Sequence, residues 1–283
     1  MEDIFGPKLS LDNGNFAIQY VLRTGQVSMA RAHAHPFYEL FYCLGGGRSF
    51  FMNGSVYEMQ PGDVVLVNPS DLHRTANNET KRCERILIHF TEQFLAPELA
   101  RADAALLPFP AGSPLLRFQL KDQAAVEAIC RKMLEEATLS REGCVTSIRA
   151  LLMLLLVLIR RLRHPAATGQ APSEHPLHQK ISEIAAYLGA HLEESLTLEE
   201  VAGRFYISPS YLSRIFKRVT GFSFREYVQM IRIREAQRLL RTSPDKISVI
   251  AEKTGFIQTA HFNVVFKKLT GVTPMYYRKH KED

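Results

Sequence analysis

The 283-residue sequence predicts an α+β multidomain protein. Three observations support this: the first hundred residues contain short strand-like segments with tight turns, the middle changes to helical spacing, and the last hundred residues contain one helix pair twice. We expect an antiparallel β-barrel over 1–120, a helical segment over 121–163, a linker over 164–177 and an all-α domain over 178–283. The hydrophobic share of 46% excludes general disorder.

The strands of the barrel are predicted from segments rich in β-branched and aromatic residues. They are 16–22, 37–44, 48–52, 55–60, 64–67 and 85–90. Asn53-Gly54 favours a hairpin, because both residues accept the positive φ of a tight turn. Pro61-Gly62-Asp63 marks the next turn. Many short strands joined in this way are typical of a sandwich or barrel.

The segment over 121–163 reads as two helices. The second, 145–162, is apolar on more than one face, so it needs two partners to bury it. One is the barrel, and the other is either a second copy of the chain or the chain's own core. We favour the second copy, which makes this a dimerisation segment and the protein a homodimer. The proline-rich, aperiodic stretch that follows (HPAATGQAPSEHP, 164–176) is typical of an interdomain linker.

Several classes of protein are excluded by composition. The longest apolar run, Ala150–Ile159, is too short for a bilayer, which needs ~20 residues. The N-terminus MEDIFGPKLS has no apolar core and is no signal peptide. The four cysteines form no CxxC pair, so we expect buried free thiols. We therefore expect a cytoplasmic protein with no membrane partner.

The net charge of +6 belongs entirely to the C-terminal part. Residues 1–177 contain 18 Lys+Arg and 18 Asp+Glu, whereas residues 178–283 contain 17 and 11. A basic domain beside a neutral one indicates a polyanionic partner for the basic domain.

This basic part repeats itself at an offset of 50 residues, so that 211–221 aligns with 261–271. The identical pairs are Phe216/Phe266, Lys217/Lys267, Thr220/Thr270 and Gly221/Gly271. A short helix precedes each copy, after a one-residue adjustment. The two units, 196–219 and 246–270, therefore each read as a helix-turn-helix.

Capping signals mark where these helices begin and end. Thr197-x-x-Glu200 and Ser223-x-x-Glu226 are capping boxes, and Ser208-Pro209 is an N-cap followed by proline. Gly255 supplies the turn of the second unit. The helix from Ser223 to about Arg241 would be roughly 28 Å long. Because successive major-groove faces lie ~34 Å apart, this helix could hold both units on one face of a duplex.

Three arginines lie on this connecting helix, Arg232, Arg234 and Arg238. They are expected either to contact phosphates or to form a solvated charged face.

Residues 180–278 resemble the DNA-binding domain of the AraC family of transcription regulators. The segments that carry the resemblance are FYISPSYLSRIFKRVTG (205–221), IAEKTGF (250–256), HFNVVFKKLTG (261–271) and TPMYYR (273–278). The resemblance implies a non-enzymatic regulator that binds double-stranded DNA and works with RNA polymerase.

One departure from the family concerns Val264. The family commonly has Arg there, as this chain has Arg214 at the matching place of the first unit. We therefore expect the first unit to read sequence more strongly. The second would be positioned partly through Lys267, Lys268 and Arg278.

The start of each second helix is expected to face the major groove. The candidate residues are Ser208, Ser210, Tyr211, Ser213 and Arg214 in the first unit and Gln258, Thr259, His261 and Asn263 in the second. Arg can pair with guanine, and Gln or Asn with adenine. Lys217 and Lys267 come later in each helix and are expected to contact phosphates.

The barrel contains His33-x-His35-x-x-x-Glu39 and, further on, His73, a pattern that resembles the cupin barrels. Residues two apart on a strand share a face, so His33 and His35 could both point inward. We favour these four residues as the pocket for a small-molecule effector, as in the sensor domains of AraC-like regulators. The expected effector is a sugar or a related carbohydrate metabolite, and no cofactor is expected.

Two other interpretations of these residues stay open. The four side chains could hold a divalent metal, since three imidazoles and a carboxylate suit Zn, Fe, Mn or Ni. They could also be plain structural histidines.

Two functions are consistent with the whole chain. The first is a regulator whose effector controls how two helix-turn-helix units are presented to adjacent major-groove segments. The second is a metal-dependent cupin enzyme that also binds DNA. We favour the regulator, because the sequence contains no nucleophile elbow, P-loop or dinucleotide fingerprint to support other enzyme chemistry.

Overall fold

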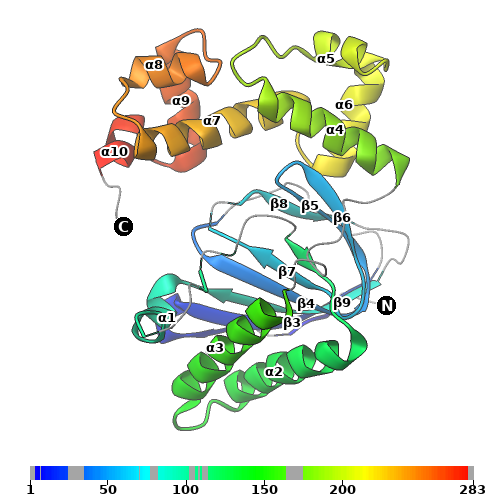
Figure 1. Ribbon diagram of the computed structural model, residues 1–283, viewed down its shortest axis with the longest axis vertical. Helices are drawn as coiled ribbons and strands as arrows, with labels where there is room; N and C mark the ends of the chain where they lie inside the picture. The colour runs from blue at the N-terminus through cyan, green and yellow to red at the C-terminus, as the bar shows by residue number, and fades with distance from the viewer. Residues whose placement is uncertain are drawn as a thin grey trace. The chain divides into compact units, whose positions relative to one another are not determined.

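The chain divides into two compact units, Met1–His175 and Pro176–Asp283. The computed structural model describes residues 4–6, 8–24, 35–69, 71–76, 82–101, 106–107, 109, 114–163 and 175–279. Each unit has its own elements and its own hydrophobic core (Figure 1).

The first unit contains two antiparallel sheets, which confirms the cupin-like barrel. The larger sheet has the order β1 (Ile4–Phe5), β3 (Phe16–Thr24), β9 (Arg82–Phe90), β4 (Tyr38–Gly46), β7 (Val64–Val67) and β10 (Leu115–Leu116), with β2 (Leu9–Leu11) also paired to β3 and the 3-10 turn η1 (Asp12–Gly14) following β2. The smaller sheet has the order β6 (Ser55–Met59), β5 (Arg48–Met52) and β8 (His73–Ala76).

The turns between strands follow the glycine signals. Asn53 and Gly54 both have positive φ, +49° and +88°, and close the β5–β6 hairpin in which Met52 faces Ser55. Gly62 has a φ of +86° in the predicted turn before β7. Strand β9 begins at Arg82, three residues earlier than expected, because it pairs along its whole length with β3.

Side-chain alternation gives the larger sheet two different faces. Tyr38, Leu40 and Tyr42 of β4 belong to the core beneath the helices, whereas Phe41 and Cys43 belong to the core between the sheets. Helices α2 (Leu120–Leu139) and α3 (Cys144–Leu162) cover the outer face, together with α1 (Glu92–Leu99), which had not been predicted (Figure 1). The smaller sheet covers the other face. The space between the sheets is therefore the barrel interior.

Helix α3 buries most of its apolar residues in the core of its own chain. Ile148, Leu152, Leu155, Leu156 and Ile159 are buried against α2 and the sheet. Leu154 lies on the opposite side with 53% of its side chain exposed. The helix is confirmed where it was predicted, and its role in a homodimer stays a prediction.

The second unit is all helical, as predicted. Its elements are α4 (Pro176–Ala190), α5 (Leu198–Arg204), α6 (Pro209–Thr220), α7 (Phe224–Thr242), α8 (Ile247–Lys253), α9 (Thr259–Thr270) and α10 (Pro274–Lys279). Helix α4 begins at Pro176, inside the predicted linker 164–177, because proline is well suited to the first turn of a helix. The linker residues 164–174 lie outside the described residues.

Cys43, Cys83 and Cys130 are buried free thiols, as expected, and Cys144 is half-buried. Among the described helices, none combines the length and the apolarity needed to cross a membrane.

Candidate functional site

In the first helix pair of the second unit, both helices begin at a side-chain N-cap. The Thr197 hydroxyl accepts from the Glu200 amide at 3.2 Å, and the Glu200 carboxylate accepts from the Thr197 amide at 3.1 Å, which confirms the capping box of α5. Ser208 caps α6 by accepting from the Tyr211 amide at 3.2 Å. Between the two helices Tyr206 has a φ of +55°, a left-handed conformation that is unfavourable for a tyrosine.

Helix α6 has one buried and one exposed face. Leu212, Ile215, Phe216 and Val219 pack into the unit. The predicted DNA-reading residues Ser208, Ser210, Tyr211 and Arg214 are exposed, as is Lys217, and Ser213 is half-buried. The Arg214 guanidinium lies over the Tyr211 ring at 5.6 Å. Arg214, Lys217 and Ser213 line a groove of about 660 Å³ on this side of the helix.

The second pair, α8 and α9, repeats the arrangement. Phe262, Val265 and Phe266 are buried, whereas Gln258, His261, Asn263 and Lys267 are exposed and Thr259 is half-buried. Val264 is exposed on the surface where Arg214 lies in the first pair. The connection between the two helices is one residue longer in the second pair than in the first. The extra residue is Ile257, which is fully exposed between the Gly255 turn and the start of α9.

The two pairs differ in how their helices begin. The N-cap residues of α8 and α9 are Lys246 and Gln258, and neither side chain forms a capping hydrogen bond. Both pairs nevertheless end alike: Thr220 donates to the Phe216 carbonyl and Thr270 to the Phe266 carbonyl, each at 2.8 Å.

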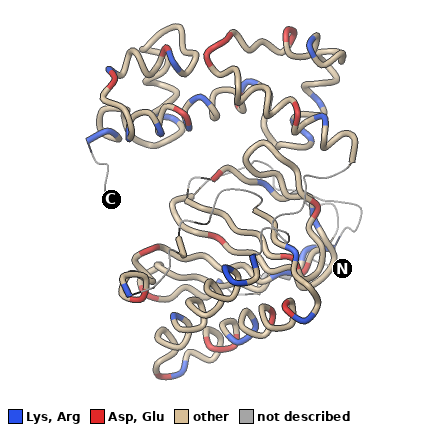
Figure 2. The backbone as a smooth tube through the Cα atoms, in the orientation of Figure 1, with Lys and Arg blue, Asp and Glu red and all other residues tan. Residues whose placement is uncertain are grey.

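Helix α7 joins the pairs and is 19 residues long. The predicted capping box is present, with the Ser223 hydroxyl accepting from the Glu226 amide at 3.3 Å. A groove of about 670 Å³ beside α7 is lined by residues of both pairs, among them Ser213, Gln258 and His261. Lys and Arg are distributed along these helices (Figure 2). The second unit thus has two polar helix faces: Ser213, Gln258 and His261 line the groove beside α7, and Arg214 and Lys217 line the groove on α6.

Three arginines of the second unit that were candidates for DNA contact or positioning also have partners within the protein. Arg232 donates to the Leu192 carbonyl at 3.1 Å and to the Glu194 carbonyl at 2.7 Å. Arg238 pairs with Glu235 one turn earlier on the same helix. Arg278 donates to the Asp245 carbonyl. Long side chains that reach back to their own backbone were not visible from residue type alone.

The barrel interior contains a cluster around Glu39, which is 3% exposed. His35 Nε2 lies 3.2 Å from Glu39 Oε2, and His73 Nε2 lies 3.4 Å from Glu39 Oε1. His89 Nε2 lies 2.5 Å from Glu39 Oε2. Three of the predicted pocket residues therefore meet, and the fourth, His33, lies outside the described residues.

The backbone orients two of these imidazoles. His35 Nδ1 lies 2.8 Å from the Phe37 carbonyl and His73 Nδ1 lies 2.9 Å from the Asp71 carbonyl, so each Nδ1–H donates outward and Nε2 points to Glu39. Burial alone would raise the pKa of the Glu39 carboxyl, but hydrogen bonds from His35, His73 and His89 lower it well below its usual value. The cluster therefore holds an ionised carboxylate inside the barrel.

The two parts of the chain match two known families. Residues 18–156 match an AraC-like ligand binding domain, and residues 201–280 match a helix-turn-helix domain. The chain belongs to the AraC family of transcription regulators.

This AraC-family chain is similar to several named proteins. The transcriptional activator RhaR of Cronobacter sakazakii is 28% identical over 257 residues, covering 87% of this chain and 86% of its own. The regulatory protein PocR of Salmonella typhimurium is 38% identical over 112 residues, 40% of this chain and 36% of its own. Among solved structures, the C-terminal domain of AraT, a response regulator from Geobacillus stearothermophilus, is 36% identical and covers 37% of this chain and 87% of its own, with a TM-score of 0.36.

The relatives also decide between the two functions that the sequence left open. RhaS of Escherichia fergusonii is 24% identical over 253 residues, 88% of this chain and 88% of its own. RhaR and RhaS are both named transcriptional activators, and both matched domains are regulatory. The AraC-family chain is a regulator and not a cupin enzyme.

Sequence reasoning missed His89 as a member of the cluster in this AraC-family barrel. It lies on β9 directly opposite Glu39 of β4. The signal was alternation: in the predicted strand 85–90, His89 shares a face with Arg85 and Leu87. Placing that face toward Glu39, however, requires the register between two strands that are 50 residues apart.

Proposed function

We propose that this regulator binds double-stranded DNA through both helix pairs and presents them to adjacent major-groove segments. The observation that carries the proposal is that α6 and α9 each bury aromatic residues on one side and expose polar and basic residues on the other. Both helices pack against α7. A rigid connector of this length, roughly 28 Å, fits one helical turn of DNA.

The proposed contacts follow from exposure and position. Arg214 is assigned to guanine, and Gln258 and Asn263 to adenine. Ser208, Ser210, Tyr211, Ser213, Thr259 and His261 are assigned to base edges or the adjoining backbone, and Lys217 and Lys267 to phosphates. Val264 makes the second pair the weaker reader, because its side chain has no hydrogen-bonding group.

Half-site spacing tests this arrangement. After footprinting has located the bound sequence, duplexes are compared that carry the two half-sites at native spacing or with 5 or 10 added base pairs. Five added base pairs place the half-sites on opposite faces of the duplex, so affinity should fall sharply. Equal affinity for all three spacings would show that α7 does not fix the two readers relative to each other.

The barrel is proposed to bind the effector, a sugar or a related carbohydrate metabolite, at His35, Glu39 and His73, with His33 as the fourth member. Imidazoles and a carboxylate on a largely apolar interior can hydrogen-bond hydroxyl groups. An effector that favours one arrangement of the chain would alter presentation of the DNA-binding unit. Footprints with and without candidate carbohydrates test this, and an unchanged footprint with a bound carbohydrate would contradict it.

A homodimer formed through α3 is also proposed. Leu154 is exposed in the middle of an apolar helix, and the neighbouring Leu151 and Leu158 are only partly buried, so one stripe is left for a second copy. We further propose that the regulator acts in the cytoplasm and contacts RNA polymerase.

A divalent metal is the alternative occupant of the barrel cluster. One ligand atom from each of His35, Glu39 and His73 lies within 4.8 Å of the others. The backbone hydrogen bonds that direct both Nε2 atoms inward also suit metal ligands. Elemental analysis of the purified protein separates the two proposals, since stoichiometric metal that survives dialysis would favour the metal.

A further inference from the structure

The barrel interior contains buried positive charge. Arg48 of β5 is 2% exposed and Arg85 of β9 is 6% exposed. In the described part of this unit the buried carboxylates are Glu39, Asp63 and Asp71. A buried guanidinium needs an anionic or polar partner, because it stays protonated at any pH at which the protein is folded.

Each of these carboxylates has hydrogen-bond partners other than Arg85. Glu39 interacts with three histidines. Asp63 accepts two hydrogen bonds from Arg117, at 2.6 and 2.7 Å. Asp71 accepts from the Asn53 side chain and from the backbone amide of Asn68.

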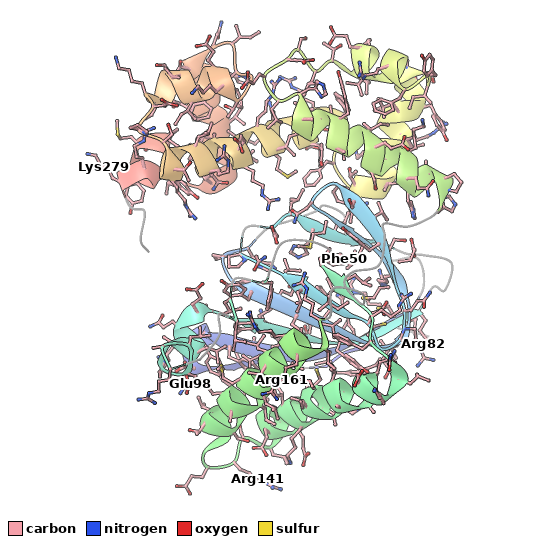
Figure 3. All side chains as sticks on the ribbon, in the orientation of Figure 1. Phe50, Arg82, Glu98, Arg141, Arg161 and Lys279 are labelled. Carbon is pink, nitrogen blue, oxygen red and sulfur yellow. The ribbon has the colours of Figure 1, made fainter. Side chains whose placement is uncertain are left out.

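Arg85 points between the two sheets. Along β9 it shares a face with Cys83 and Leu87, both of which belong to the core between the sheets or pack against it. Its guanidinium lies 4.7 Å from the Phe41 ring centroid, in the same core. Phe50 of the facing sheet belongs to this core as well (Figure 3).

The Arg85 guanidinium is incompletely bonded. Its Nε and Nη1 atoms are buried and have no hydrogen-bond partner among the described residues. Burial lowers the pKa of the Arg85 guanidinium. Cys83 and Glu39 raise this pKa, whereas the positive charges of Arg23 and Arg48 lower it further. Nearby, a hydrogen bond from Cys43 lowers the pKa of the Cys83 thiol, burial opposes this, and the charges of Arg85 and Arg48 lower it further. The electrostatic potential at this point of the interior favours an anion.

We propose that the effector of the barrel carries an oxyanion, a carboxylate or a phosphate, which Arg85 binds beside the positive charge of Arg48. A guanidinium pairs with either group through two parallel hydrogen bonds. The inference rests on the proposed effector function of the barrel and defines its ligand more closely. His89 lies four residues further along β9 than Arg85, about 13 Å along the backbone at the usual strand rise. It faces Glu39 of β4, and both side chains offer hydrogen-bond partners for hydroxyls. An acidic or phosphorylated sugar presents both kinds of group.

The test uses the full chain and named probes in thermal-shift and calorimetric titrations. Inorganic phosphate is compared with chloride at equal ionic strength, D-galacturonate with D-galactose, and glucose 6-phosphate with glucose. The oxyanion member of a pair should raise Tm and bind, and its neutral partner should not. The galacturonate and glucose 6-phosphate arms distinguish a carboxylate from a phosphate ligand.

Arg85→Met removes the charge and keeps the length of the side chain. It should bind the responding probe at least about tenfold more weakly, with an unliganded Tm no lower than that of the wild type. Arg82→Met is the matched control, because Arg82 lies on the same strand with its side chain 56% exposed and paired with Glu84 (Figure 3). It should bind like the wild type.

Four results would overturn the inference: no wild-type response to any oxyanion probe, binding of a neutral sugar as tight as that of its acid, an unchanged response in Arg85→Met, or a large drop in the unliganded Tm of that variant. A neutral sugar that binds and alters the DNA footprint would overturn the oxyanion assignment alone and leave the proposed effector function standing.

Discussion

Arg232 and Gly255 meet at a single atom, the backbone carbonyl oxygen of Leu192. Arg232 Nε donates to this oxygen at 3.1 Å, and a Cβ at Gly255 would lie 2.1 Å from it. Helix α7, the loop after α4 and the turn of the second helix pair are therefore fixed together at one point. Arg232, which residue type left open between DNA contact and a solvated face, thus has a structural role within the unit.

Gly255→Ala should destabilise the second unit by about 2 kcal/mol or more, because the new Cβ meets backbone at a φ of +77°. Gly271→Ala is the control: its φ is +82°, but no described atom lies within 4 Å of the added Cβ. That variant should lose only about 1 kcal/mol. Urea denaturation followed by circular dichroism measures both, and equal losses would show that the Leu192 contact is unimportant.

Tyr206→Gly should stabilise the second unit by about 0.5–1 kcal/mol. Tyr206 has a left-handed backbone and is 96% exposed, so the substitution relieves strain and removes little packing. Tyr206→Ala retains the strained backbone and should gain nothing. A loss of stability in the glycine variant would mean that the tyrosine ring contributes a contact that outweighs its strain.

Arg214→Ala should lower affinity for the specific site by about 1–3 kcal/mol and relax the preference at one base position. Val264→Ala, at the matching place of α9, should change affinity little. Binding is measured on the footprinted site and on variants of it at fixed salt, because salt alone changes affinity strongly. Equal weakening on every sequence would reassign Arg214 to a phosphate.

The barrel should lose stability in acid through Glu39. Its pKa is lowered on folding, so its contribution is complete above its usual value of 4.5 and is lost as the pH falls through the lowered value. Glu39→Gln should be less stable than the wild type by about 2–4 kcal/mol near neutral pH. The Tm difference between the two proteins should then shrink as the solution is acidified. A difference that is independent of pH would show that the carboxylate charge contributes nothing.

Leu154→Lys should weaken the proposed homodimer. A charge in the apolar stripe of α3 has to be desolvated when a second copy covers it. Leu120→Lys at the start of α2 is the control, because that leucine is also exposed but lies outside the stripe. Analytical ultracentrifugation of both variants over a concentration series decides the matter. Unchanged association of the Leu154 variant would place the interface elsewhere.

The second unit was predictable from sequence because its signals are local. Capping boxes at Thr197 and Ser223 and the repeated Thr-Gly ends lie within a few residues of the helices they define. The roles of Arg232 and Arg278 were missed, since their acceptors lie 40 and 33 residues away. Residue type alone does not distinguish an arginine that donates to a backbone carbonyl of the same chain from one that is available to contact DNA.

In the barrel, too, contacts between residues far apart in the sequence could not be predicted. Alternation and glycine turns predicted β3, β4, β5, β6, β7 and β9 to within a few residues, but β1, β2, β8 and β10 were not predicted. The partners of Glu39 depend on the register of β4 with β9 and on the facing sheet, which no single segment encodes. Helix α1 was missed because it contains Pro97, which argues against a helix in sequence.

The unequal caps of the two helix pairs have an entropic consequence. In the free protein the first turn of α6 is stabilised by the N-cap hydrogen bond of Ser208, whereas the Gln258 side chain forms no such bond at the first turn of α9. If the second pair binds a half-site as proposed, part of the cost of ordering the first turn of α9 should fall on DNA binding. Backbone amides at the start of α9 should exchange with solvent faster than those at the start of α6 in the free protein, and this difference should narrow on DNA. The proposed DNA readers would then differ in preorganisation, with α6 the more preorganised and α9 the more adaptable.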